Sequence, residues 1–172
     1  MPVIATARKL DIDVYVIGQQ DAVNGSFGAT VTYVAAHMDP PTPGLVDFRT
    51  GNINLNAIPL SSRNDPKYLM EIDIIFTLKA SIFDKLGNAV PAIFATPTAQ
   101  YGCLVLNPHG NPPHSMSVSS VSDVKIKLDD DNAEGDRPTA DRTYSYGLGI
   151  VLPSQDNYFI SLDPTVLKSG PH

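Results

Sequence analysis

The sequence is poor in charged residues, in cysteine and in long apolar runs. Charged residues make up 17% of its 172 residues, where about 25% is usual. Acidic residues (18) outnumber basic residues (12), so the net charge is -6 at pH 7. Nucleic-acid binding needs a basic surface that displaces counterions, and anionic membranes attract basic segments. We therefore expect neither nucleic acid nor a membrane as a partner.

The scarcity of cysteine and of long apolar runs indicates the cellular compartment in which we expect the protein. Cys103 is the only cysteine, so no disulfide can form within the chain. No apolar run reaches the length of about 18 residues that a membrane-spanning helix needs. Arg8 and Lys9 interrupt the N-terminal segment before it resembles a secretory signal. A single thiol and no signal fit a reducing compartment, and we expect a cytoplasmic protein.

Residues that break helices are abundant. The chain has 15 prolines and 12 glycines, and a proline inside a helix costs about 3 kcal/mol. Long helices are therefore excluded. Apolar and polar residues alternate in several stretches, which predicts half-buried strands. The clearest stretches are 11–17, 29–36, 70–79, 118–128, 144–152 and 158–162, and shorter candidates are 45–48, 53–55, 89–95 and 100–106.

This pattern predicts an all-β fold in a single domain over residues 1–172. The expected architecture is an antiparallel β-sandwich, Ig-like or jelly-roll-like, with about 8–10 short strands and little helix. A closed barrel is the alternative. A βαβ fold would need long crossover helices, for which the prolines leave little room.

Five segments, taken in chain order, are similar to those of one bacterial family. They are Ile12–Ile17, Thr32–His37, Asp47–Asn54, Thr143–Ile150 and Tyr158–Val166. In these segments the chain resembles the PixA/AidA family, named for a crystalline inclusion-body protein and a quorum-regulated protein. The resemblance implies a small cytoplasmic β-protein that accumulates to a high level in a bacterium. It supplies no settled catalytic residues to carry over.

Three asparagines, Asn52, Asn54 and Asn56, alternate with two aliphatic residues. On a strand this spacing places the three amides on one face. Each amide both donates and accepts hydrogen bonds, as recognition of sugar hydroxyls requires. These residues are candidate ligand-binding residues for a carbohydrate, and a solvated polar face is the alternative.

The densest group of oxygen ligands lies in the segment 129–136. Calcium takes about six to eight oxygen ligands, so Asp129, Asp130, Asp131 and Asp136 are candidate metal ligands. Their contiguity does not fit an EF-hand, and a solvated hairpin loop is the alternative. Calcium is the only cofactor that the sequence suggests.

Motifs for catalysis are missing. No serine lies in a Gly-x-Ser-x-Gly elbow, and the segment 147–149 lacks the third glycine and the following helix of a phosphate loop. Cys103 lies in an apolar run, which favours a buried thiol over a nucleophile. His37, His109 and His114 adjoin proline-rich loops, and we expect them in solvent rather than on zinc. The protein is therefore not expected to be an enzyme.

Two hypotheses about function remain. In the first, the chain is a non-catalytic protein that resembles the PixA/AidA inclusion-body proteins and associates with itself at high abundance, up to crystalline inclusions. Its low charge density supports this hypothesis, because few like charges oppose contact between copies. In the second, it is a lectin-like module that binds a carbohydrate or small ligand, with or without calcium. A hydrolase whose site is assembled from loops is the least supported class.

Overall fold

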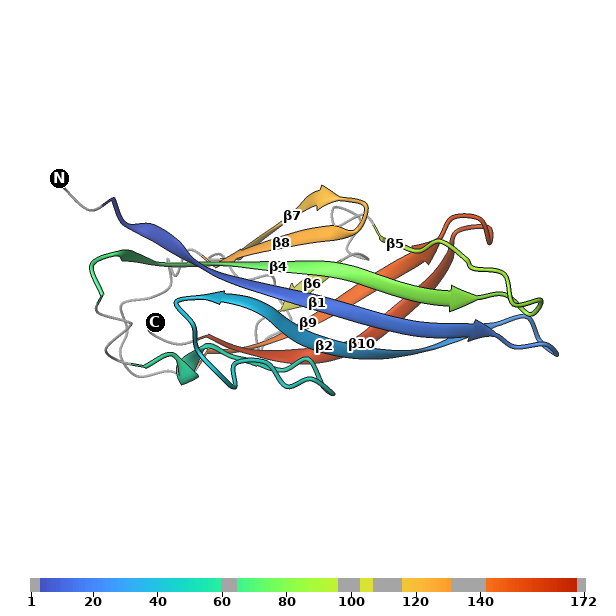
Figure 1. The fold of residues 1–172 in the computed structure, drawn as a ribbon, viewed down its shortest axis with the longest axis horizontal. Coiled ribbons are helices and arrows are strands. Elements are labelled where there is room, and N and C mark those ends of the chain that lie inside the picture. Colours follow the sequence, from blue (N-terminus) through green and yellow to red (C-terminus); the bar gives the residue numbers. More distant parts are fainter. Residues whose placement is uncertain (1–3, 60–64, 96–102, 107–115, 131–141, 170–172) are drawn as a thin grey trace.

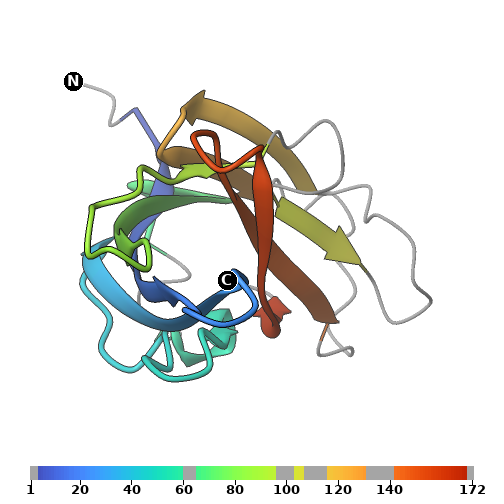
Figure 2. The ribbon, with the colours of Figure 1, turned by 90° about the vertical axis from the view of Figure 1, so that its right-hand side faces the viewer.

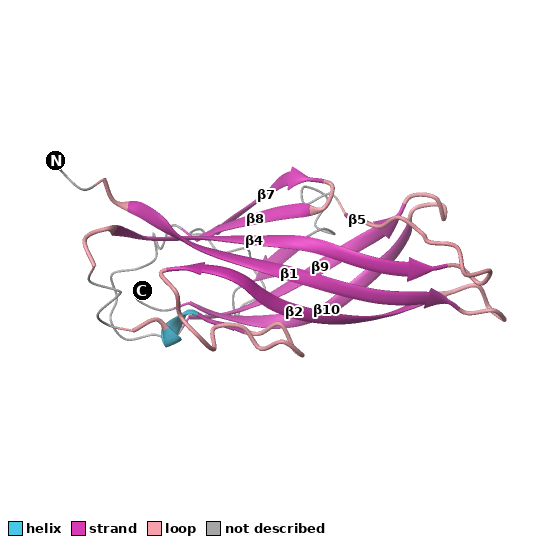
Figure 3. Ribbon diagram, viewed as in Figure 1, coloured by secondary structure: helices cyan, strands magenta, loops and turns pink. Residues whose placement is uncertain are grey.

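Strands make up most of the chain. The computed structural model describes residues 4–59, 65–95, 103–106, 116–130 and 142–169, with one turn of 3-10 helix, η1 (Leu55–Ala57) (Figure 3). The strands are β1 (Thr6–Gln20), β2 (Phe27–Asp39), β3 (Ile53–Asn54), β4 (Tyr68–Phe83), β5 (Ile93–Phe94), β6 (Cys103–Leu106), β7 (Met116–Ser122), β8 (Lys125–Asp130), β9 (Arg142–Leu152) and β10 (Tyr158–Ser169). In this part of the chain no helix has the length and apolar character of a membrane span.

The strands form two sheets that pack face to face (Figures 1 and 2). The first sheet has the order β2-β1-β4-β8-β7. The second has the order β3-β10-β9-β5, and β6 also pairs with β9. The prediction of an all-β sandwich is confirmed, with the core between the two sheets.

Alternation of side chains decides which face of each sheet is buried. In β1, β4, β8 and β9 the residues that point inward alternate with outward ones and are apolar, apart from Arg8 and the glycine of β1 and Asp130 of β8. The Phe76 ring of the first sheet meets the Tyr146 ring of the second at 5.5 Å between centroids. Burying each large apolar side chain stabilises the fold by about 1.5–3 kcal/mol. The inward residues of these four strands are Leu10, Ile12, Val14, Val16, Ile72, Ile74, Phe76, Leu78, Ile126, Leu128, Tyr144, Tyr146, Leu148, Ile150 and Leu152.

Two pairings depart from the predicted antiparallel arrangement: the short pair of β3 with β10, where Ile53 lies beside Leu167, and the long pair of β1 with β4. β1 and β4 run parallel along almost their full lengths, from Thr6 beside Tyr68 to Gln19 beside Phe83. Parallel neighbours need a long crossover connection. Here the crossover consists of β2, β3 and η1 rather than a helix, and the proline-rich segment 40–44 lies within it. The first sheet is therefore mixed, because alternation reveals which face is buried but not the strand direction.

Several strand limits also differ from the prediction. The stretch 118–128 is a hairpin, β7 and β8, because Asp123 and Val124 form a turn without any glycine signal. The segment 45–48 contributes only an isolated bridge between Val46 and Ile53. β10 continues beyond Leu162 through an irregularity in its pairing with β9, so proline at 164 does not end it.

A loop glycine fixes the crossover against the core. Gly51 has φ +72°, in the left-handed region, and its carbonyl accepts a hydrogen bond from the Tyr146 hydroxyl at 2.5 Å. A Cβ added at Gly51 would lie 2.7 Å from the Tyr33 ring. Gly44 has a similar φ of +75°, but an added Cβ there meets nothing within 4 Å. A comparison of substitutions at the two glycines therefore distinguishes the cost of backbone strain from the cost of steric overlap.

We expect Gly51→Ala to destabilise the protein more than Gly44→Ala. Both variants carry the left-handed penalty of about 1–2 kcal/mol. Gly51→Ala adds the displacement of the Tyr33 ring, for about 1–3 kcal/mol more. Urea unfolding of the two variants and the parent measures the difference, and equal losses would show that Tyr33 does not confine Gly51.

Candidate functional site

The three asparagines do not share one strand face. Asn52 and Asn54 are exposed while Ile53 and Leu55 are buried, as the alternation predicts. β3 ends at Asn54, however, and the 3-10 turn η1 that follows carries Asn56, which is half-buried. Hence only Asn52 and Asn54 present amides in an extended segment. Carbohydrate binding by these residues stays a prediction.

The candidate metal ligands that the structure describes lie on a strand, not in a loop. Asp129 and Asp130 end β8 and point to opposite faces of the first sheet. Asp130 is buried on the inner face, beside Ile72 of β4. Asp131 and Asp136 lie outside the described residues, within which no group of three His, Cys, Asp or Glu side chains is placed to hold a metal. Calcium binding stays a prediction.

Asp129 takes part in an ion cluster on the outer face of the first sheet. The Lys127 ammonium lies 2.8 Å from a carboxylate oxygen of Asp129 and 3.2 Å from one of Asp73. Asp73 and Asp129 are direct neighbours on β4 and β8. The cluster lines a shallow hollow of about 380 Å³, together with Ala7, Glu71 and Asp130.

The two carboxyl groups of the cluster are driven apart in pKa. Burial, followed by the hydrogen bond with Asp129, raises the pKa of Asp73 above its usual value. Burial also acts to raise the pKa of Asp129, but the hydrogen bonds with Asp73 and Lys127 outweigh it and the pKa is lowered. The hydrogen bond with Asp129 raises the pKa of Lys127. The Lys127 ammonium thus offsets the electrostatic repulsion between the carboxyl groups of Asp73 and Asp129.

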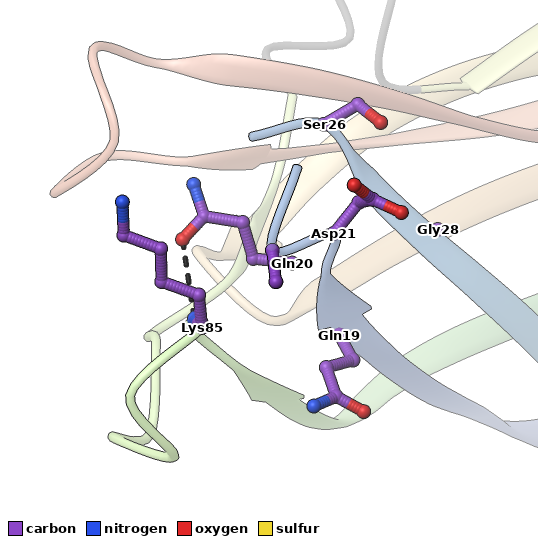
Figure 4. A pocket seen from close by; sticks show the side chains of 7 residues that line it. Gln19, Gln20, Asp21, Ser26, Gly28 and Lys85 are labelled. Carbon is purple, nitrogen blue, oxygen red and sulfur yellow. Dashed lines mark hydrogen bonds between the residues drawn. The ribbon is translucent and has the colours of Figure 1, made fainter. Parts of the chain in front are cut away.

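A second hollow lies at the tip of the molecule, between the β1–β2 turn and the turn after β4 (Figure 4). Its volume is about 480 Å³ and its lining is polar. The Gln20 amide joins the two turns, because it donates to the Gly25 carbonyl at 2.9 Å and accepts from the Lys85 backbone at 3.2 Å. The other residues that line it are Gln19, Asp21, Ala22, Ser26 and Gly28.

The chemistry of this tip hollow suits a small polar ligand. Amide, hydroxyl, carboxylate and ammonium groups surround it. Asp21 is held ionised, because backbone hydrogen bonds from Asn24 and Val23 lower its pKa. Both of those bonds go to Oδ1 of Asp21. None of the residues that the sequence analysis proposed for carbohydrate or calcium lines this hollow.

Apolar side chains are exposed together on the outer face of the first sheet. Tyr15 and Ile17 follow one another on that face of β1, with 42% and 65% of their surfaces exposed. Val34 of β2 lies diagonally beside Tyr15, and Phe83 of β4 diagonally beside Ile17, each 42% exposed. We call these four residues the apolar patch. Single exposed apolar residues are common, whereas larger groups of neighbouring ones are found at interaction sites.

Cys103, weighed as a nucleophile, and His37, weighed as a zinc ligand, are placed as expected. Cys103 is buried, and burial raises the pKa of its thiol to about 12, so the reactive thiolate is not formed at neutral pH. Tyr144 and Tyr146 lie in the core. His37 is exposed on β2, while His109 and His114 fall outside the described residues.

One polar group was not anticipated from the sequence. Arg8 is buried on the inner face of β1, where it donates to the Leu69 carbonyl at 2.6 Å and stacks 5.4 Å from the centre of the Tyr68 ring. The Tyr68 hydroxyl donates to Asp39 at 2.6 Å, and this bond raises the pKa of Tyr68. A buried arginine needs such partners. The only signal in the sequence was the position of Arg8, two residues before Leu10, which places it on the same face of β1 as the buried residues.

Comparison with protein-family models and with curated proteins finds no match to this chain. The site is therefore described by its own geometry.

We expect Lys127→Met to lower the free energy of unfolding by about 1 kcal/mol or less at pH 7. The pKa of Asp129 is lower in the folded protein than in the unfolded chain. The ionised Asp129 therefore stabilises the fold at a pH above its unfolded pKa, and this stabilisation is lost as the pH falls through its folded pKa. The raised pKa of Asp73 has the opposite effect, because its ionisation lowers the free energy of unfolding at neutral pH. Removing the ammonium therefore costs stability at pH 7 and little at about pH 2.5.

Urea unfolding at both pH values measures this effect. Lys125→Met is the matched control, because Lys125 is exposed on the same face of β8 and outside the ion cluster. A loss for Lys127→Met that is independent of pH, or equal to that of the control, would contradict the assignment.

Proposed function

We propose that this chain is a non-catalytic protein that associates with further copies of itself through the outer face of its first sheet. The observation that carries this proposal is the apolar patch of Tyr15, Ile17, Val34 and Phe83. Both β1 and β4 lie inside the sheet, so the patch rests on rigid strands rather than on loops. A rigid surface loses little conformational entropy when a partner covers it.

The distribution of charge favours a second copy at this surface. On the outer face, Tyr15, Ile17 and Gln19 of β1 each have one direct neighbour on β2 and one on β4. These three cross-strand rows contain a single charged side chain, Lys79. Val34 lies in the next row, directly opposite Asp13, while Asp11 and the ion cluster lie farther along the same face. Although the chain carries a net charge of -6, two copies that meet over the rows of Tyr15, Ile17 and Gln19 bring no carboxylates of those rows together.

The size of the patch sets the strength of association. Three strands about 4.8 Å apart, over rows about 6.8 Å apart, give an area on the order of 300 Å². A stable pair of proteins buries about 800 Å² on each partner. The patch therefore supports weak association that becomes extensive only at high protein concentration. This matches the abundant cytoplasmic self-association that the PixA/AidA resemblance implies.

We expect Ile17→Lys to abolish association at high concentration. Sedimentation velocity from about 10 µM to 1 mM spans the range of weak contacts. The parent should gain apparent mass across this range, while Ile17→Lys should remain monomeric, because its ammonium cannot be desolvated against a second patch.

Val23→Lys is the matched control. Val23 is 97% exposed in the β1–β2 turn, outside the patch, and its replacement changes the net charge by the same amount. This variant should associate like the parent. A parent that stays monomeric at 1 mM, or equal losses in both variants, would contradict the proposal.

A further inference from the structure

A second surface for association lies at the margin of the first sheet. β7 is the outermost strand of that sheet and pairs with β8 (Figure 1). Within the described residues no strand lies beyond it. On the side away from its neighbour, the outermost strand of a sheet presents backbone donors and acceptors that can pair with another strand.

Other edge strands of the two sheets donate backbone hydrogen bonds to loops at single positions or are very short. Along β2, the Tyr33 backbone donates to the Phe48 carbonyl at 2.9 Å. At β3, Asn54 donates to the Leu45 carbonyl at 2.8 Å, and at β5, Phe94 donates to the Asp123 carbonyl at 2.8 Å. The edge strand β6 has only four residues. Among the described residues, β7 donates no backbone hydrogen bond of this kind.

The sequence of β7 lacks the usual protection of an exposed edge. Natural edges carry lysine, proline or a bulge that prevents pairing with other chains. Met116–Ser122 contains no charged residue, proline or glycine. A bulge between Ser120 and Ser122 protects only its end, so Met116–Ser120 keeps regular pairing geometry.

We propose that Met116–Ser120 pairs antiparallel with the same segment of a second copy, about a two-fold axis through Val118. This axis is perpendicular to the sheet. The inner faces of the two copies therefore lie on the same side of the joined sheet. The half-buried Val118, which packs against the core, would then meet its own copy on the inner face. On the outer face, Ser117 would lie opposite Ser119, with no charges in contact.

This contact is distinct from the apolar patch and has a different consequence. A two-fold contact on one surface closes into a dimer. A copy that uses both surfaces, the patch and the β7 edge, contacts two different neighbours, which allows assemblies larger than a dimer. The β7 contact thus explains how association could grow beyond pairs, and it holds or fails separately from the patch.

Single cysteines placed in turn at each position from Met116 to Ser120 test the pairing. In an antiparallel pair, the residue on the axis has its Cα about 5 Å from its copy, and one position away the separation is about 8–9 Å. A disulfide needs a Cα separation under about 7 Å. Air oxidation at high protein concentration should therefore give one sharp maximum of cross-linked dimer, at Val118→Cys. Cys103 does not compete, since it is buried.

Val23→Cys, exposed in the β1–β2 turn, gives the yield from random collisions. A single maximum within Met116–Ser120, well above this yield, supports the edge contact, and a neighbouring maximum only shifts the axis. Equal yields at all five positions, or yields no higher than the control, overturn it. Val118 is half-buried and cysteine is smaller than valine, so Val118→Cys should fold, and a cooperative urea transition for each variant checks this before the yields are compared.

The same scan in the Ile17→Lys background separates the two contacts. A maximum that persists there supports pairing at β7 even if the apolar patch does not associate. If the scan is flat in both backgrounds while the parent still gains mass in sedimentation, the β7 proposal fails and the patch stands.

Discussion

The parallel pairing of β1 with β4 organises the rest of the molecule. These two strands form the middle of the first sheet, with β2 beyond β1 and β8 beyond β4. Because they run in the same direction, the chain between them must return across the molecule, and it does so through β2, which pairs with β1 at the edge of the first sheet, and β3, which joins the second sheet. The alternation of β1 and β4 fixes which side chains enter the core. The opposite side chains form the outer face.

The functional surfaces follow from this arrangement. The outer face of the central strands is charged over one half, where Lys127 neutralises Asp73 and Asp129, and apolar over the other half. The first feature stabilises the fold at neutral pH without presenting a metal site among the described residues. The second is an exposed surface on rigid strands. Since β7 ends the same sheet, both proposed contacts belong to one sheet, and the tip hollow belongs to the turns that join its strands.

The sequence predicted the buried faces well, because alternation reports burial directly. Ile12, Val14 and Val16 of β1 and the inward residues of β4 and β9 are all in the core. Alternation carries no information on strand direction, so the parallel pair was missed, and the turn at Asp123 lacks glycine, so the β7–β8 hairpin was read as one strand. The candidate sites depended on loops and single strands. Asp129 and Asp130 were grouped by proximity in sequence, yet consecutive strand residues point to opposite faces. The apolar patch joins residues from three strands, which one segment cannot reveal.

Native-state hydrogen exchange tests the central role of the β1–β4 pair most directly. The amides of residues 10–16 and 74–78 should exchange only through global unfolding, with the free energy measured by urea unfolding, because strands pair with β1 and β4 on both sides. Amides of the two turns at the tip should exchange through smaller openings. Exchange in β1 or β4 at a lower free energy than in β9 and β10 would show that the second sheet, and not this parallel pair, holds the fold together.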